Sequence, residues 1–287
     1  MGPIKRLQGV IIRTPKFPES VDYYVKGFGL TLVSDDGKRA VFDGARGCAG
    51  VLEIIAGEEA GLVGLTFAMP DADALRTSKV ELAAKGYAAS DRAEGGGAFS
   101  VISPDGQVIA FVTDAGAPDA ESTADGLPLF VSHTVINSLD APRLTSFFVD
   151  VLGFRVADRY ERDLLTFLKV DQPQHHCVGV SPGESSSLNH FSLDVGSIDG
   201  LMRSVGRMQK AGYTPIWGPG RHGPGGNVFC YFEDPTGFVA EFTCDVLQIE
   251  DEKTWVPKEW PRVPDTANVW GTGGPSLRAV ALMSGNH

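Results

Sequence analysis

The stretch "HTVINSLDAPRLTSFFVDVLGF" at residues 133–154 decides the fold, because "GVIIRTPKFPESVDYYVKGFGL" at residues 9–30 has the same pattern. At this offset of 124 residues, Ile12 matches Ile136, Pro18 matches Pro142 and Gly29 matches Gly153. Each stretch reads as a short β-branched strand, then a helix with a proline near its first turn and a glycine where it ends. The pattern therefore predicts one structural unit used twice.

Further matches extend the repeat through each half of the chain. The segment "FAMPDADAL" at 67–75 lines up with "SLDVGSIDGL" at 192–201, and "SPDGQVIAF" at 103–111 lines up with "DPTGFVAEF" at 234–242. Within each copy, a second β-α unit starts near residues 64 and 190 and ends in a hairpin. The helices are expected at 18–27, 71–85, 141–151 and 197–211. We therefore predict an α+β fold in which each half contains two βαβββ modules.

These matches also suggest where the domains begin and end. We expect domains at 1–114 and 129–245, joined by a linker at 115–128 that is small, polar and rich in Pro and Gly. Residues 246–287 have no repeat partner. They form a tail with Trp255, Trp260 and Trp270 among several prolines. Large aromatic residues argue against full disorder, so the tail is expected to pack over the second domain without regular structure.

Composition excludes several classes of partner. Hydrophobic residues make up 43% and charged residues 21% of the 287 residues, as in folded globular proteins. Lys and Arg number 25 and Asp and Glu number 36, a net charge of −11 that argues against nucleic acid or an anionic membrane as main partner. There is no long apolar run and no signal-peptide pattern, so we expect a cytoplasmic protein. The cysteines form no CxxC pair and are expected to be free thiols: Cys48, Cys177, Cys230 and Cys244.

Three residues of the second copy have metal-binding side chains that the first copy lacks. The matched pairs are His133 and Gly9, His190 and Gly64, Glu241 and Ala110. A single histidine in a strand is usually structural, and a glutamate in "FVAEF" either faces solvent or is held by a cation. The joint replacement of all three indicates a set that functions together. Two imidazoles and one carboxylate are typical of mononuclear Fe(II) sites that activate O2, and Mn(II) accepts the same ligands.

The stretch "GRHGPGGNVFCYFEDPTGFVAEF" at 220–242 resembles the signature of type I extradiol ring-cleavage dioxygenases of the vicinal oxygen chelate superfamily. The residues at matching places are His222, Tyr231, Asp234, Pro235, Gly237 and Glu241. Cys230 departs from the large apolar residue usual before the tyrosine, which changes packing rather than chemistry. "HH" at 175–176 followed by "LNHF" at 188–191 also resembles the family pattern. The resemblance covers nearly the whole chain.

This resemblance implies tandem domains with cupped mixed sheets around a pocket, the first domain without metal. It implies Fe(II)-dependent meta cleavage of a catechol-type aromatic by O2 in aromatic compound degradation. His176 is then the acid–base residue, and His222 and Tyr231 are catalytic and contact substrate, although a histidine in a Gly/Pro-rich loop can also be a surface residue. Arg221 is a candidate contact for a substrate carboxylate. Family likeness also predicts a homo-oligomer. His175 is interpreted as a strand neighbour on the face opposite to His176.

Other functions of the same fold stay open at this point. The paired-module fold also hosts glyoxalases, epimerases, thiol transferases and metal-free drug-binding proteins, so the fold alone does not choose a function. A glyoxalase-like lyase typically uses four protein ligands, whereas the first copy offers none at a matching place. A metal-free binding module would not need the three ligands together with His176 and Tyr231. A dioxygenase of hydroquinones is an open alternative. The sequence indicates neither the substrate ring nor the bond that is cleaved.

Overall fold

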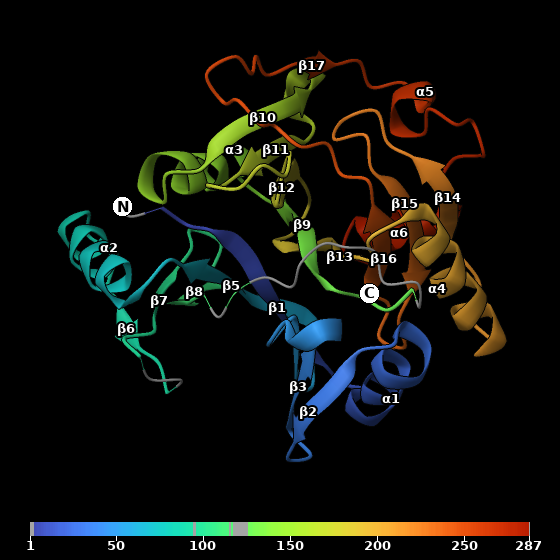
Figure 1. The fold of residues 1–287 in the computed structure, drawn as a ribbon, viewed down its shortest axis with the longest axis horizontal. Helices are drawn as coiled ribbons and strands as arrows, with labels where there is room; N and C mark the ends of the chain where they lie inside the picture. Colours follow the sequence, from blue (N-terminus) through green and yellow to red (C-terminus); the bar gives the residue numbers. More distant parts are fainter. Residues whose placement is uncertain (1–2, 94–95, 115, 117–125, 287) are drawn as a thin grey trace.

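The computed structural model describes residues 3–93, 96–114, 116 and 126–286. Most of the expected linker, residues 115 and 117–125, lies outside the described residues. The described chain forms two mixed sheets, which occupy the two halves of the sequence in turn (Figure 1). The order in the first sheet is β2-β3-β4-β1-β5-β8-β7-β6, and in the second it is β14-β15-β16-β13-β9-β12-β11-β10-β17. The predicted α+β fold of paired modules is confirmed.

The elements have the following bounds. The first sheet consists of β1 Arg6–Thr14, β2 Thr31–Asp35, β3 Arg39–Asp43, β4 Leu52–Ala56, β5 Gly61–Met69, β6 Ser90–Asp91, β7 Phe99–Ile102 and β8 Val108–Thr113. The second consists of β9 Phe130–Ser138, β10 Arg155–Tyr160, β11 Thr166–Lys169, β12 Val178–Pro182, β13 Ser187–Asp194, β14 Trp217–Arg221, β15 Val228–Glu233, β16 Val239–Cys244 and β17 Glu259–Trp260. The α-helices are α1 Phe17–Asp22, α2 Ala72–Ala84, α3 Ala141–Ser146, α4 Ile198–Lys210, α5 Pro264–Ala267 and α6 Leu277–Met283.

The first helix of each half changes from α-helical to π-helical along its length. After α1, the chain continues as a π-helical turn at Tyr23–Phe28, and after α3 it does so at Phe147–Val151. The expected end signal is present, because Gly29 has a left-handed φ of 90°. At the start of α3, the Asp140 side chain accepts a hydrogen bond from the backbone N–H of Arg143. The sequence therefore predicts where these helices lie but not their wider turns.

Strand register supports the alignment of the two halves residue by residue. Gly64 in β5 pairs with Ile11, and His190 in β13 pairs with Val135, which is the equivalent place 124 residues later. The neighbouring strands agree as well, because Ala110 pairs with Thr66 and Glu241 pairs with Ser192. The small residues of the first half thus occupy the same sheet positions as the candidate ligands of the second half.

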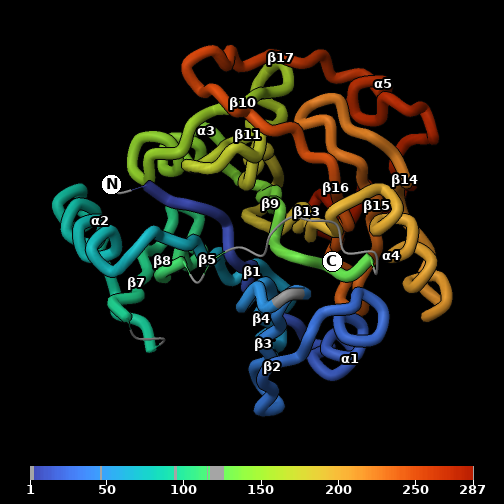
Figure 2. The backbone as a smooth tube through the Cα atoms, in the orientation of Figure 1, coloured from blue at the N-terminus to red at the C-terminus, as the bar shows by residue number. Residues whose placement is uncertain are grey.

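The tail contains regular structure, so the expectation of an irregular tail is wrong. Strand β17 pairs in parallel with β10 at the edge of the second sheet. Helices α5 and α6 follow, and α6 contacts β13 and β16. Figure 2 shows the tail, in orange-red to red, running along the outside of the second half from β10 towards α5. Short pairings of this kind depend on distant strands, so local sequence patterns do not reveal them.

The two halves pack together through aromatic residues near α1. The rings of Phe28 and Phe242 stack with centroids 4.0 Å apart. The Tyr24 hydroxyl donates to Oδ2 of Asp234, 2.9 Å away, in the turn between β15 and β16. This packing holds the first half against strands of the second sheet (Figure 1). Among the described residues, no helix is long and apolar enough to cross a membrane.

Candidate metal centre and its cavity

Three neighbouring strands bring the candidate ligands together. His133 lies in β9, His190 in β13 and Glu241 in β16, and these strands are adjacent in the second sheet. Nε2 of His133 lies 3.0 Å from Oε2 of Glu241, and Nε2 of His190 lies 3.6 Å from the same oxygen. One ligand atom of each residue falls within 4.8 Å of the others. The arrangement is buried, with Glu241 0% exposed.

The donor set fits a divalent cation. Nδ1 of His190 lies 2.7 Å from the Asn189 Oδ1, and Nδ1 of His133 lies 3.1 Å from the Ser132 Oγ, so Nε2 of each ring is left for the centre. Burial lowers the pKa of His190 to about 3, which keeps this imidazole neutral. Among the described residues, Oε2 of Glu241 has no hydrogen-bond donor in acceptable geometry. A buried carboxylate oxygen of this kind, between two imidazole nitrogens, is what a metal ion would satisfy.

Electrostatics keep the carboxylate charged. Burial by itself would raise the pKa of Glu241, but the neighbouring imidazoles, His133 first, hold that pKa below its ordinary value. Oε1 of Glu241 accepts a hydrogen bond from Nδ2 of Asn227 at 3.3 Å, and the same amide donates to Thr243 Oγ1 at 2.9 Å. Oε1 is therefore held in place by Asn227, while Oε2 faces the two imidazoles. This is the usual way in which outer partners orient a ligand.

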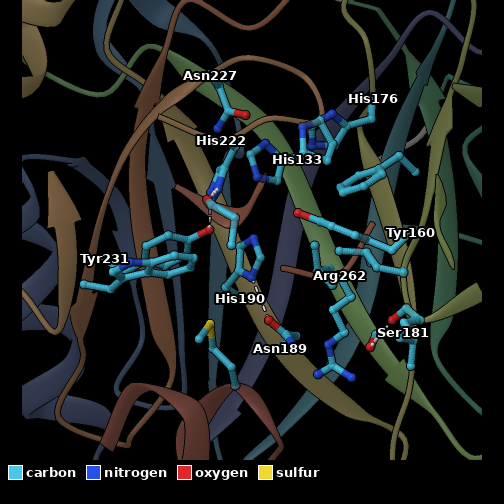
Figure 3. A pocket seen from close by; sticks show the side chains of 18 of the residues that line it. His133, Tyr160, His176, Ser181, Asn189, His190, His222, Asn227, Tyr231 and Arg262 are labelled. Carbon is cyan, nitrogen blue, oxygen red and sulfur yellow. Dashed lines mark hydrogen bonds between the residues drawn. The ribbon is translucent and has the colours of Figure 1, made fainter. Parts of the chain in front are cut away.

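A cavity of about 250 Å³ opens beside the three ligands. Figure 3 shows His133, His176, His222 and Asn227 gathered at one end of it. Ser181 and Arg262 lie at the opposite end (Figure 3). Apolar side chains also line the cavity: Val135, Leu164, Leu165, Phe167, Val263 and Met283. A site with mostly apolar walls and a few convergent polar groups suits a small aromatic molecule.

His222 and Tyr231 form a fixed pair at the metal end. Nδ1–H of His222 donates to the backbone carbonyl of Ala267 at 2.7 Å, which leaves Nε2 as an acceptor. The Tyr231 hydroxyl, 3.1 Å from that Nε2, therefore donates to it. Burial, with the nearby Glu241 charge, raises the pKa of Tyr231 well above its ordinary value, so the phenol stays protonated. The structure thus places His222 in the cavity rather than on the surface.

His176 also lines the cavity, and its ring lies close to that of His133, with centroids 4.6 Å apart. Burial, with repulsion from the neighbouring histidines, lowers the pKa of His176 well below 6.5, so the imidazole is neutral. The sequence suggested that His175 is a strand neighbour on the face opposite to His176. It does not line the cavity, but it lies outside the strands and its ring contacts that of His176. Its Nδ1 lies 3.0 Å from Nδ1 of His176, and its ring is fully buried.

Arg221 does not fit the substrate contact suggested by the sequence. Its guanidinium pairs with Asp245 at 2.9 Å, contacts the carbonyl of Gly226 and lies over the ring of Trp270. The side chain is not among those that line the cavity. The prediction rested on the position of Arg221 next to His222 in the sequence, but Asp245 and Trp270 hold the Arg221 side chain elsewhere.

The sequence did not indicate several of the residues that line the cavity or support its ligands. Asn189 and Asn227 hold the ligands, while Tyr160 and Arg262 line the cavity from β10 and the tail. A polar residue in a buried strand, such as Asn227, is a signal that could have been noticed. No sequence signal points to Arg262, because the tail has no repeat partner and its path depends on tertiary packing.

Comparisons with known proteins agree with this geometry. The sequence model of the Glyoxalase/Bleomycin resistance protein/Dioxygenase superfamily matches residues 130–242. Metapyrocatechase 2 of Cupriavidus necator is 30% identical over 150 residues, which are 52% of this chain and 46% of that protein. An iron-dependent extradiol dioxygenase of Rhodococcus jostii (strain RHA1) is 28% identical over 155 residues, 49% of this chain and 50% of that protein. The chain thus spans about half the length of these relatives.

Solved structures match over nearly the whole chain, and one of them is a metal-bound enzyme. The Mn(II)-bound glyoxalase from Novosphingobium aromaticivorans is 28% identical, with a TM-score of 0.86, and the match covers 97% of this chain and 94% of that one. The likeness therefore includes the first half and the tail as well as the segment that carries the candidate ligands.

Proposed function

We propose that the chain is an Fe(II)-dependent extradiol dioxygenase that cleaves catechol-type aromatics in aromatic compound degradation. The match of residues 130–242 to the sequence model of the Glyoxalase/Bleomycin resistance protein/Dioxygenase superfamily supports this proposal. The observation that carries the proposal is the convergence of His133, His190 and Glu241 beside a mostly apolar cavity that both histidines line. Two relatives that match about half of the chain are named metapyrocatechase and extradiol dioxygenase, which supports it.

The three ligands are proposed to hold ferrous iron. When bound, iron supplies open coordination positions at which a catechol and O2 meet and exchange electrons. Iron is favoured by the relative described as iron-dependent, whereas the Mn(II)-bound structure supports manganese as the alternative. Both atoms of O2 would enter the opened ring, and the product would be a yellow semialdehyde or dienoate acid.

The other cavity residues have roles that follow from their protonation. His176 is neutral and beside the ligands, so it can take a proton from a catechol hydroxyl and return it later. The Tyr231 phenol stays protonated and donates its one proton to Nε2 of His222, so its oxygen can accept a hydrogen bond from a catechol hydroxyl. His222, tied by Nδ1 to the tail, keeps Nε2 towards that phenol and orients it. The apolar walls would exclude water from the ring.

Oxygen uptake tests this proposal directly. The full chain is purified anaerobically, loaded with Fe(II) and given catechol, methyl- and carboxyl-substituted catechols and hydroquinones in air-saturated buffer. We expect O2 consumption with one of the catechols and a yellow product whose mass equals substrate plus O2. His133→Ala and Glu241→Ala should retain no iron, whereas His176→Phe should retain iron and turn over slowly. The absence of oxygen uptake across the panel would contradict the proposal.

A Mn(II)-dependent reaction of the glyoxalase type is the second candidate. The match to the Mn(II)-bound glyoxalase favours it, because that match extends over both halves. Against it, the first half has Gly9, Gly64 and Ala110 at the places of the ligands. Isomerisation of a 2-oxoaldehyde–thiol adduct by the Mn(II)-loaded chain, without oxygen uptake on catechols, would favour this candidate.

Location and assembly also belong to the proposal. The four cysteines are buried free thiols, as expected from the sequence, and this supports a reducing compartment such as the cytoplasm. The homo-oligomer expected from family likeness stays a prediction, and analytical ultracentrifugation of the full chain would test it.

A further inference from the structure

A buried carboxylate lies behind the two adjacent histidines. Asp158 in β10 is 1% exposed, and its Oδ2 lies 3.1 Å from Nε2 of His175. The tail also holds this carboxylate, because the backbone N–H of Lys258 donates to Oδ1 at 2.7 Å and Nε1–H of Trp260 donates to Oδ2 at 2.8 Å. Burial acts to raise the pKa of Asp158, but these donors and His175 together lower it, so the group is an anion.

The anion determines which nitrogen of His175 carries the proton. Nε2 of His175 meets no aligned acceptor among the described residues, and the Asp158 oxygen is the polar atom recorded beside it. A bare Nε2 would place its lone pair against a carboxylate, so the proton belongs on Nε2. When the ring carries this one proton, Nδ1 of His175 is a bare acceptor.

The tautomer of His175 in turn determines that of His176. The two Nδ1 atoms lie 3.0 Å apart, a distance at which one must donate to the other. Because Nδ1 of His175 is bare, Nδ1 of His176 carries the proton and its Nε2 is bare. Gly225 closes the space behind both rings, since a Cβ there would lie 3.1 Å from Nδ1 of His176 and 3.3 Å from Nδ1 of His175.

We propose that Asp158 and His175 are positioning residues that hold His176 with its proton on Nδ1 and with Nε2 free to accept a substrate proton. The proposal rests on the acid–base role given to His176 in the proposed function. No proton passes along the chain of three residues. When His176 takes a proton on Nε2, its Nδ1–H remains bonded to His175, and the Asp158 charge stabilises the cation. Removal of the charge should therefore slow proton transfer without weakening substrate binding.

Nitrogen NMR tests the tautomers without any need for activity. The full chain is labelled with ¹⁵N-histidine and loaded with Zn(II) as a diamagnetic ion, and the ring signals are assigned with His176→Phe. We expect His175 protonated on Nε2 and His176 on Nδ1. In Asp158→Asn, an amide replaces the anion and this pattern should be lost, whereas Trp260→Phe keeps the charge and should keep the pattern. A wild-type His176 protonated on Nε2 would overturn the proposal.

A kinetic cycle tests the consequence with catechol as substrate. Asp158→Asn should lower kcat at least ~10-fold, with KM and bound iron nearly unchanged, because the effect acts through proton transfer. In the His176→Phe background, the same substitution should change kcat less than ~2-fold. An equal loss in both backgrounds would indicate a structural role and overturn the proposal. A wild-type chain inactive on all catechols would instead refute the proposed function, while the NMR result would still decide the tautomers.

Discussion

At the scale of single residues, Glu241 makes the strongest case for a metal. Its carboxylate is fully buried, and Oε2 lies near two imidazoles without an aligned donor among the described residues. Fe(II) or Mn(II) should therefore stabilise the metal-free protein and raise its Tm. At a metal concentration 100 times Kd, the free energy of unfolding should increase by ~2.7 kcal/mol. Glu241→Gln removes the charge but keeps the shape, so its Tm should not respond to metal. Differential scanning calorimetry with and without metal makes the measurement.

A matched control for this experiment is Glu233→Gln. Glu233 is in the neighbouring strand β15, and it pairs with Arg278 away from the three ligands. Metal should raise the Tm of this variant as it does that of the wild type. A metal-induced shift of equal size in Glu241→Gln would contradict the assignment of Glu241 as a ligand.

The sequence predicted some site residues and missed others for a physical reason. The repeat picks out His133, His190 and Glu241, because equivalent sheet positions can be compared within one chain. It says nothing of Asp158, whose partners come from the tail, 100 residues later. Arg221 was misplaced for a similar reason, since its direction depends on Asp245. A repeat therefore predicts where a residue lies in the backbone of the sheet. It does not predict side-chain contacts with residues that are distant in the sequence.

At the scale of elements, the end of β13 carries a carboxylate that opposes folding at neutral pH. Burial, with repulsion from Asp245, raises the pKa of Asp194 to about 6, against 3.8 for an ordinary aspartate. Between these values the folded state binds more protons than the unfolded state, so this group destabilises the fold as pH rises. Asp194→Asn keeps the hydrogen bond from Gly196 and should be more stable than wild type by at most ~3 kcal/mol at pH 7.5.

The pH dependence of the stability gain in Asp194→Asn distinguishes removal of a buried charge from an improvement in packing. Near pH 4, the advantage of Asp194→Asn should shrink below ~1 kcal/mol, because the wild-type carboxyl is then protonated in the folded state and partly protonated in the unfolded state. Urea denaturation at both pH values measures it. As a control, Asp73→Asn changes a side chain that is 81% exposed and should alter stability by less than ~0.5 kcal/mol at either pH. A pH-independent advantage would contradict the burial argument.

The positions of helices and strands were predictable where residues close in the sequence, such as capping residues, determine them. Helix α2 begins after the Asp71 cap and α4 after the Ser197 cap, close to the expected bounds. The π-helical turns after α1 and α3 were not predictable, because the wider turn depends on packing against the sheets rather than on capping residues. The same holds for β17, a two-residue strand that exists through its pairing with β10.

At the scale of the whole molecule, the first half supports the second without lining its cavity. All residues recorded around the cavity fall between His133 and Met283. The contact between halves depends in part on Tyr24, whose hydroxyl donates to Oδ2 of Asp234, while Oδ1 accepts from three backbone N–H groups of the turn. The contact is buried, and burial raises the pKa of Asp234 to about 6 despite these donors.

Two adjacent tyrosines allow a matched test of this contact. Tyr24→Phe leaves Oδ2 of Asp234 buried without its donor, so we expect a loss of ~1–3 kcal/mol in the free energy of unfolding. Tyr23 is equally buried, but its hydroxyl has no hydrogen-bond partner among the described residues, so Tyr23→Phe should be neutral or stabilising. Metal affinity should be unchanged in both variants, because the three ligands lie in the second sheet. Equal losses of stability in the two variants would contradict the prediction that the hydrogen bond between Tyr24 and Asp234 stabilises the contact between the halves.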